Sequence, residues 1–142
     1  MLHIVLLEPE IPQNTGNISR TCAVTGAELH LIGPMGFSID DRSLKRAGLD
    51  YWSMLQVFYY DSWQAFRVAH PQVRPWMATS KGAQAYTQAR YGDDAWLLFG
   101  KETHGLPEPL LAADYARTVR IPMREGARCL NLSNAVAVMA YE

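Results

Sequence analysis

Polar and basic side chains gather in three short segments, and each segment begins where an apolar run ends. The first, residues 8–22 (EPEIPQNTGNISRTC), carries Asn14, Asn17 and Arg20 at intervals of three, so these side chains can share one helix face. Amide and guanidinium donors beside the N–H groups of a helix start would suit a phosphate. A Pro/Asn/Gly turn before a helix with a solvent-facing arginine explains the same residues, so this segment alone does not define a site.

The second segment, residues 97–107 (LLFGKETHGLP), runs from an apolar strand into two glycines separated by four residues. Leu106 and Pro107 stand where a P-loop requires Lys and Ser/Thr, so the spacing does not indicate a nucleoside triphosphate site. The G-x-G-x-x-G pattern of dinucleotide sites is also absent. Gly100 at the strand end would allow close approach of a ligand. A tight turn with a solvated Glu102 is the alternative.

The third segment, residues 121–134 (IPMREGARCLNLSN), is a strand end, a basic loop and the start of a helix. Asn131, Ser133 and Asn134 all stand at this helix start. One of them can be the N-cap, which stabilises a helix by about 1 kcal/mol. Three polar residues in an otherwise apolar stretch exceed what one cap needs, and this surplus favours a binding site.

The net charge is −1, which does not by itself indicate a nucleic-acid partner. The distribution of basic residues is more informative, because ten of the thirteen are arginines. The planar guanidinium suits phosphate, although ion pairs on a solvated surface would use the same side chains. Four arginines fall within twelve residues that hold a single acid: Arg117, Arg120, Arg124 and Arg128.

Short apolar runs alternate with helical patterns along the chain. This alternation predicts an α/β fold, a single domain with a mostly parallel sheet and helices on both faces. Asp61 is the expected N-cap of the third helix. Ligands bind such sheets at the carboxyl ends of strands, where all three polar segments lie. Strands are predicted over residues 2–7, 28–32, 55–60, 76–79, 95–99 and 118–121, and helices over 17–26, 40–47, 62–69, 107–113 and 132–141.

Several features limit the class of protein. No apolar run approaches the roughly 20 residues of a membrane span, and the N-terminus lacks the basic start of a signal peptide. Cys22 and Cys129 form no disulfide framework, and the four histidines lack zinc-ligand spacing. We therefore expect a cytoplasmic domain over residues 1–142 with no membrane anchor and no metal. The helical pattern reaches Glu142 without a cap signal, so we expect a short C-terminal segment to be missing.

The last predicted helix is apolar nearly all round, with the sequence AVAVMA at residues 135–140. Such a helix is usually buried on all sides. The pattern leaves two explanations open: burial within one chain, or burial against a second subunit.

Taken together, P-x-N-x-G-N-x-x-R, LLFGKETHGLP and I-P-M followed by L-N-L-S-N resemble the SPOUT superfamily of RNA methyltransferases. The resemblance spans the chain and is closest to the TrmL (YibK-like) group, which 2′-O-methylates the wobble nucleotide, cytidine or uridine 34, of leucine tRNAs. It implies S-adenosyl-L-methionine as cofactor, S-adenosyl-L-homocysteine as product, a homodimer, tRNA as the partner and a C-terminal trefoil knot. Knots are rare, so connectivity rules alone would not predict one.

The resemblance also implies roles for individual residues. Arg20 would be the catalytic residue, described in the family as a base assisted by the RNA phosphate. An arginine side chain keeps its proton near neutral pH, which makes a phosphate clamp that orients the ribose hydroxyl physically easier. Asn14, Glu102, Asn131 and Ser133 would fix Arg20, substrate or cofactor by hydrogen bonds. The cofactor pocket would comprise Met77, Ala78, Thr79, Gly100, Lys101, Glu102, Ile121, Pro122, Met123, Leu130, Leu132 and Ser133.

RNA contacts are expected from Arg20, Arg124 and Arg128, and after these from Lys45 and Arg46. Related enzymes often carry serine where Cys129 stands, which puts a catalytic role for that position in doubt. Two other functions remain open. One is a SPOUT 2′-O-methyltransferase for another tRNA or rRNA site. The other is a non-catalytic RNA-binding module, which need not bind S-adenosylmethionine.

Overall fold

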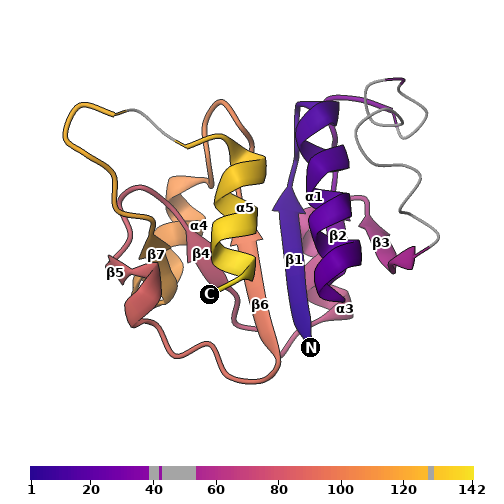
Figure 1. Ribbon diagram of the computed structural model, residues 1–142. Helices are drawn as coiled ribbons and strands as arrows, with labels where there is room; N and C mark the ends of the chain where they lie inside the picture. Colours follow the sequence, from indigo (N-terminus) through magenta and orange to yellow (C-terminus); the bar gives the residue numbers. More distant parts are fainter. Residues whose placement is uncertain (39–41, 43–53, 128–129) are drawn as a thin grey trace.

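The sheet of the computed structural model has seven strands, and every pair of neighbouring strands is parallel (Figure 1). The structure describes residues 1–38, 42, 54–127 and 130–142. The α/β prediction is confirmed, and the sheet is all-parallel rather than mostly so. In spatial order the strands are β3 (Val57–Tyr60), β2 (Glu28–Ile32), β1 (Leu2–Leu7), β6 (Ala95–Phe99), β4 (Trp76–Ala78), β7 (Thr118–Arg120) and β5 (Gln84–Ala85).

Helices cover both faces of the sheet, as predicted. Successive strand residues point to opposite faces, so a strand buried on both sides is apolar throughout. In β1, Ile4 and Leu6 pack into one core cluster, and Val5 and Leu7 pack into the other. The first cluster contains residues of α1 (Pro12–Thr25) and α5 (Leu132–Ala140), and the second contains residues of α3 (Trp63–Ala69) and α4 (Glu108–Ala113).

Helix α1 begins at Pro12, five residues before the predicted start at residue 17. Proline suits the first helical turn, because it lacks the N–H group that would have no partner there. The Pro/Asn/Gly composition of residues 12–16 indicated a loop, but Gly16 is buried inside the helix. Residues 12–22 of the first segment, Asn14 included, are therefore helical.

Three smaller expectations also change. Ser62, not Asp61, caps α3, because its hydroxyl accepts a hydrogen bond from Ala65 N at 3.1 Å. The third strand begins at Val57 rather than at residue 55. The two-residue strand β5 was not predicted, since it is too short to show a periodic pattern. The helix predicted over residues 40–47 lies outside the described residues, apart from Arg42.

Helix α5 buries only part of its apolar surface within the chain. Val136 and Met139 are buried against the sheet and α1, whereas Val138 is 37% exposed and Tyr141 is 69% exposed. Burial within one chain therefore accounts for one face of the helix, and burial against a second subunit stays a prediction for the exposed face. Among the helices that the structure describes, none combines the length and apolar character needed to cross a membrane.

Candidate active site

A cavity of about 610 Å³ lies at the carboxyl ends of β4, β6 and β7. This is where α/β sheets bind ligands. Its walls come from all three segments that the sequence singled out, together with residues 78–81. Nine of the twelve predicted cofactor-binding residues line it: Ala78, Thr79, Gly100, Lys101, Glu102, Ile121, Met123, Leu130 and Leu132.

The other three predicted residues are not among those that line the cavity. Met77 is 2% exposed and packs in the core with Val5 and Leu98. Side chains alternate along a strand, so Met77 points away from the cavity that its neighbour Ala78 lines. Pro122 is exposed on the loop after β7, and Ser133 belongs to the cap of α5.

Gly100 occupies a position that a side chain could not share. A Cβ atom there would lie 2.1 Å from the carbonyl carbon of Gly105 and 2.3 Å from Leu106 N. The chain folds back at this point, and Gly105 N donates a hydrogen bond to Lys101 O at 2.8 Å. The sequence left open whether this segment binds a ligand or forms a tight turn. The two are compatible, since the tight turn is itself part of the cavity wall.

Glu102 binds the start of helix α1 rather than solvent. Its Oε1 accepts a hydrogen bond from Glu10 N at 2.8 Å, and its Oε2 accepts from Ile11 N at 2.9 Å and from Asn14 Nδ2 at 3.2 Å. Ile11 is the N-cap of α1 and offers no side-chain cap of its own. The Glu102 carboxylate supplies the acceptor and negative charge that a helix N-terminus favours.

The contact between these two loops is reciprocal. Glu10 Oε1 accepts hydrogen bonds from Thr103 Oγ1 at 2.7 Å and from Thr103 N at 3.0 Å. The Thr103 hydroxyl and then the Thr103 N–H lower the pKa of Glu10 below its usual value. Lys101 Nζ also lies 3.7 Å from Glu8 Oε1. The loop after β1 and the loop after β6 are thus joined from both sides.

This arrangement corrects two expectations for the first segment. The N–H groups before α1 already bind a carboxylate, which disfavours a phosphate at that position. Asn14 and Arg20 also do not share a face, because Asn14 is 6% exposed whereas Arg20 is exposed. Each step of three residues turns about 60° around a helix of 3.6 residues per turn, so two steps separate them by about 120°.

The polar residues at the start of α5 form one cap. Asn131 Oδ1 accepts hydrogen bonds from Ser133 N at 2.9 Å, Ser133 Oγ at 2.6 Å and Asn134 N at 3.4 Å. The hydroxyl of Ser133 is therefore part of the cap, and the surplus of polar residues does not by itself require a ligand. Asn131 still lines the cavity, beside Leu130.

Sequence reasoning missed several residues at the cavity. Thr103 and His104 lie within the second segment, and Ser80 and Lys81 follow β4 in the same wall. In the sequence, Gly82 directly after Lys81 could have indicated this part of the wall. A Cβ atom there would lie 2.4 Å from the Val119 carbonyl carbon, which marks a close crossing of two backbones.

The structure describes only some of the residues that are predicted to contact RNA. Arg124 is exposed on the loop after β7, and Arg20 is exposed on α1, outside the set that lines the cavity. Among the clustered arginines that the structure describes, Arg117 lies over the Trp76 ring at 4.3 Å, and Arg120 Nη1 donates to Gly82 O at 3.0 Å. Arg128, Lys45, Arg46 and Cys129 lie outside the described residues.

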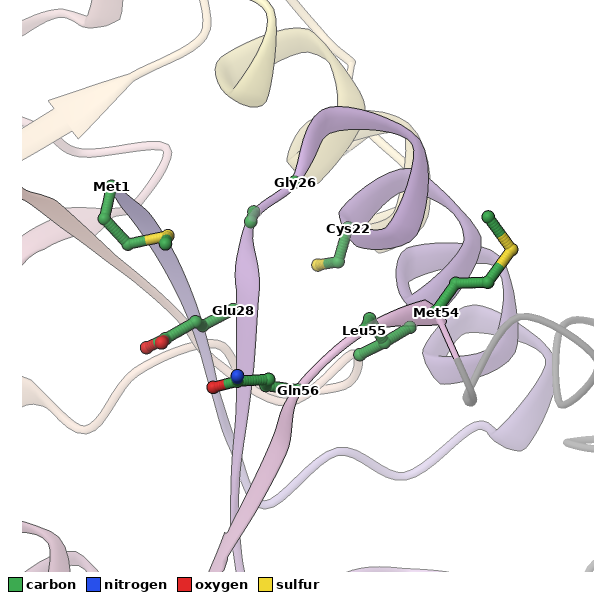
Figure 2. Close-up of a pocket in the computed structure, with 8 residues that line it drawn as sticks. Met1, Cys22, Gly26, Glu28, Met54, Leu55 and Gln56 are labelled. Carbon is green, nitrogen blue, oxygen red and sulfur yellow. The ribbon is translucent and has the colours of Figure 1, made fainter.

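Another cavity, of about 340 Å³, opens at the amino ends of β1 and β2 (Figure 2). Met1, Cys22, Glu28 and Gln56 are among its lining residues, and none of the predicted site residues is. Burial raises the pKa of the Cys22 thiol to about 12, so this thiol stays protonated.

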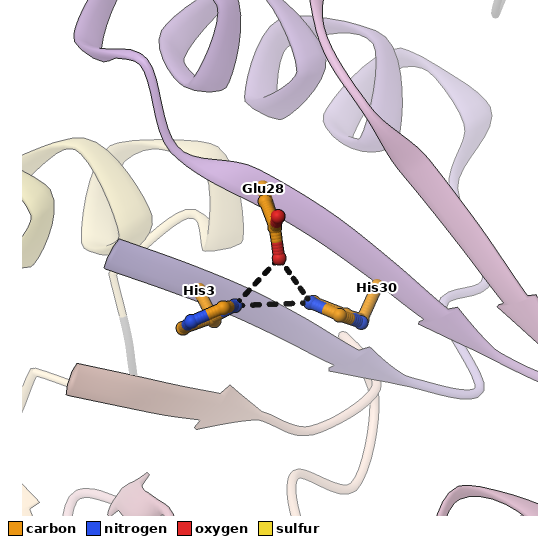
Figure 3. A group of neighbouring side chains, drawn as sticks. All are labelled: His3, Glu28 and His30. Atoms are coloured by element: carbon orange, nitrogen blue, oxygen red, sulfur yellow. Dashed lines mark hydrogen bonds and ion pairs between the residues drawn. The ribbon is translucent and has the colours of Figure 1, made fainter. Parts of the chain in front are cut away.

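Two histidines that lie far apart in the sequence meet in the fold. His3 and His30 are 27 residues apart in sequence, but parallel pairing of β1 and β2 brings their rings together. Glu28 Oε1 lies 2.8 Å from His3 Nδ1 and 3.4 Å from His30 Nε2 (Figure 3). Spacing along a single segment does not detect ligands that come from adjacent strands.

Replacing Glu102 by glutamine is expected to lower the free energy of unfolding by about 2 kcal/mol, because hydrogen bonds to a charged group contribute about 1.5–3 kcal/mol. Glutamine keeps the shape but turns an NH2 group toward a backbone N–H. Urea unfolding measures the loss. Glu108→Gln is the matched control, since its carboxylate is 80% exposed and 4.0 Å from Lys81 Nζ. Equal stability of the two variants would contradict the capping role.

Comparison with known proteins agrees with this geometry. The model of the SpoU rRNA methylase family matches residues 1–141. The tRNA (cytidine(34)-2'-O)-methyltransferase of Escherichia coli K12 is 50% identical over 143 residues, which cover 100% of this chain and 91% of that protein. The resemblance to SPOUT RNA methyltransferases is thereby confirmed.

Solved structures show the same similarity. A structure described as "Structural insights into the 2-OH methylation of C/U34 on tRNA" superposes with a TM-score of 0.92 at 46% identity, covering 99% of this chain and 92% of that one. The SpoU methyltransferase AviRb from Streptomyces viridochromogenes, in complex with the cofactor AdoMet, gives a TM-score of 0.82 at 27% identity. That match covers 99% of this chain and 56% of AviRb.

Proposed function

Since this chain belongs to the SpoU rRNA methylase family, we propose that it is an S-adenosylmethionine-dependent tRNA methyltransferase. Its acceptor is the ribose 2′-hydroxyl of the wobble nucleotide, cytidine or uridine 34, of leucine tRNAs. The observation that carries this proposal is the cavity at the ends of β4, β6 and β7, whose walls unite the three motif segments. The similar proteins named for cytidine 34 and for C/U34 support the wobble position.

The cavity suits S-adenosylmethionine. The absence of a side chain at Gly100 lets the chain turn back against Gly105, and the residues of this turn line the cavity, where a ligand can meet their main chain. Met123 and Leu130 are each 39% exposed although apolar, and both line the cavity, where an adenine ring could cover them. Polar backbone of residues 100–102 would bind the ribose and the amino-acid part.

S-adenosylmethionine supplies a methyl group that is already activated by its sulfonium. The protein's task is to align the ribose hydroxyl with that methyl, which is a proximity effect. We assign this to Arg20, as a clamp on the RNA phosphate. Arg20 is exposed on α1 and is not among the residues that line the chain's own cavity, which favours a site in which Arg20 serves the cavity of a second copy.

A cytoplasmic homodimer is therefore part of the proposal. The exposed Val138 of α5, Tyr141 directly after it, and Val24 near the end of α1 offer apolar side chains that a second copy would cover. Isolated exposed apolar residues need no explanation, but several on two packed helices favour an interface. Sedimentation of the purified protein would show a species of twice the chain mass.

A C-terminal trefoil knot is also proposed. Strand β7 lies between β4 and β5, although only residues 79–83 connect those two strands. The connection crosses β7 closely: Thr79 N donates to Val119 O at 2.9 Å, and Ala83 N donates to Thr118 Oγ1 at 2.8 Å. Because β7 passes between two strands that are joined by so short a connection, this arrangement supports a chain that threads through its own loop.

The test is incubation with total tRNA and S-adenosylmethionine carrying a labelled methyl group, followed by mapping of the modified nucleotide. We expect label on the 2′-oxygen of nucleotide 34 in leucine tRNAs. Label at another tRNA position or in rRNA would assign the enzyme to a different substrate. Absence of S-adenosylhomocysteine binding in calorimetry would instead indicate a non-catalytic RNA-binding module.

Arg124 is expected to contact an RNA phosphate. Its replacement by alanine should weaken tRNA binding and reduce the slope of log K against log salt by about 1. Arg67→Ala is the control. Arg67 donates hydrogen bonds to the backbone carbonyls of Val73 and Pro71, away from the loop that carries Arg124. An unchanged slope for the Arg124 variant would refute the contact.

A further inference from the structure

We propose that His3, Glu28 and His30 form a binding site for a divalent transition-metal ion, with Zn²⁺ as the preferred ion. The site lies at the amino ends of β1 and β2, at the opposite edge of the sheet from the proposed methyltransferase cavity (Figure 3). The inference does not depend on the proposed function.

The three ligand atoms have the spacing of a tetrahedral metal site. His3 Nδ1 and His30 Nε2 are 3.3 Å apart, and Glu28 Oε1 is 2.8 Å and 3.4 Å from them. Zinc bonds of about 2.0–2.1 Å at tetrahedral angles put neighbouring ligand atoms about 3.3 Å apart. An ion can therefore contact all three atoms with little movement of the side chains. Two imidazoles and one carboxylate, with water as a fourth ligand, are a zinc ligand set.

The surrounding hydrogen bonds direct lone pairs toward the centre of this triangle. His3 Nε2 is 2.9 Å from Asp94 Oδ1, which accepts only, so Nε2 donates to that carboxylate and Nδ1 is left to face the centre of the triangle. An Asp–His pair behind a metal is a common arrangement.

His30 is held in a similar way. Its Nδ1 lies 2.8 Å from the Tyr60 hydroxyl, which is itself 2.9 Å from His70 Nε2. His30 is 1% exposed and stacks on Phe58, so its ring is held with Nε2 toward Glu28 Oε1, 3.4 Å away.

Ring stacking fixes the ligands before any ion arrives. His3 stacks on Trp96 with centroids 3.8 Å apart and planes 7° apart, and His30 stacks on Phe58 at 4.9 Å and 15°. Such packing holds rotamers and reduces the entropy lost on binding. The Glu28 side chain is 21% exposed, which gives an ion access from solvent. Glu28 also lines the 340 Å³ cavity at this edge of the sheet (Figure 2).

The site joins three parts of the chain. His3 belongs to β1, Glu28 and His30 belong to β2, and Asp94 immediately precedes β6. An ion here would therefore stabilise the sheet and would not take part in methyl transfer.

The test uses protein without a histidine tag, stripped with a chelator and titrated with ZnCl2 by calorimetry. We expect one Zn²⁺ per chain, a higher melting temperature with Zn²⁺, and loss of that increase with EDTA. Co²⁺ in place of Zn²⁺ should give the visible absorption of a tetrahedral site. Failure of the wild-type protein to bind one equivalent of Zn²⁺ would overturn the proposal.

Variants locate the ion. Glu28→Gln keeps size and shape but removes the anionic ligand, and it should weaken Zn²⁺ binding more than Asp94→Asn, whose expected loss is about 10–100-fold. His104→Gln is the control, because His104 lines the cavity at the carboxyl ends of the strands and contributes no ligand atom, and its Zn²⁺ affinity should match the wild type. Equal affinity of the Glu28 variant and the wild type would place the ion elsewhere and refute the site.

Discussion

Replacing Arg20 by alanine is expected to reduce the rate of methyl transfer at saturating tRNA by about 100-fold or more, the effect of losing alignment at a reacting centre. The affinity for S-adenosylhomocysteine should stay within about twofold of the wild type, because Arg20 is not among the residues that line the chain's own cavity. Single-turnover assays with labelled cofactor measure the rate, and calorimetry measures the affinity. Turnover close to the wild type would exclude a catalytic role for Arg20.

Arg20→Lys separates the two roles proposed for this residue. A phosphate clamp needs positive charge, so lysine should recover part of the rate at every pH tested. A base needs the neutral side chain, and lysine loses its proton about two units lower than arginine, so its rate would instead rise steeply at high pH. The slope of rate against pH in the lysine variant therefore decides between clamp and base.

Much of the fold could be predicted because local patterns and tertiary packing agree. The apolar run of β1 matches a strand covered on both faces, and β6 ends at Phe99 as expected, just before a glycine that begins a turn. The boundaries failed where one local signal competed with another. Pro12 and Gly16 suggested a loop, yet proline fits a first helical turn and Gly16 is buried where α1 packs.

The site was less predictable, because its contacts join distant segments. The sequence identified the segments that line the cavity, but not that Glu102 caps a helix 91 residues away. Nor could spacing reveal that Asn14 points inward, toward Glu102, while Arg20 points out. The cluster of His3, Glu28 and His30 was missed for the same reason, since strand pairing rather than sequence distance brings it together.

Substituting Gly100 by alanine is expected to destabilise the protein by about 3 kcal/mol or more, at the upper end of overpacking effects. The new Cβ atom would lie 2.1 Å from the Gly105 carbonyl carbon and 2.5 Å from its oxygen. These are backbone atoms, so no change of rotamer relieves the overlap, and the turn over residues 100–105 must open. The cavity wall moves with it, and the affinity for S-adenosylhomocysteine should fall by at least about 10-fold, since a ligand held by main-chain groups depends on their positions.

Gly92→Ala is the matched control for this substitution. Gly92 has a φ of +79°, and no atom lies within 4 Å of an added Cβ. Alanine there meets backbone strain of about 1–2 kcal/mol but no collision, and Gly92 does not line the cavity. The control should therefore lose some stability and keep its cofactor affinity. If both variants bind S-adenosylhomocysteine as the wild type does, the turn at Gly100 is a folding requirement only, and the cofactor does not rest against it.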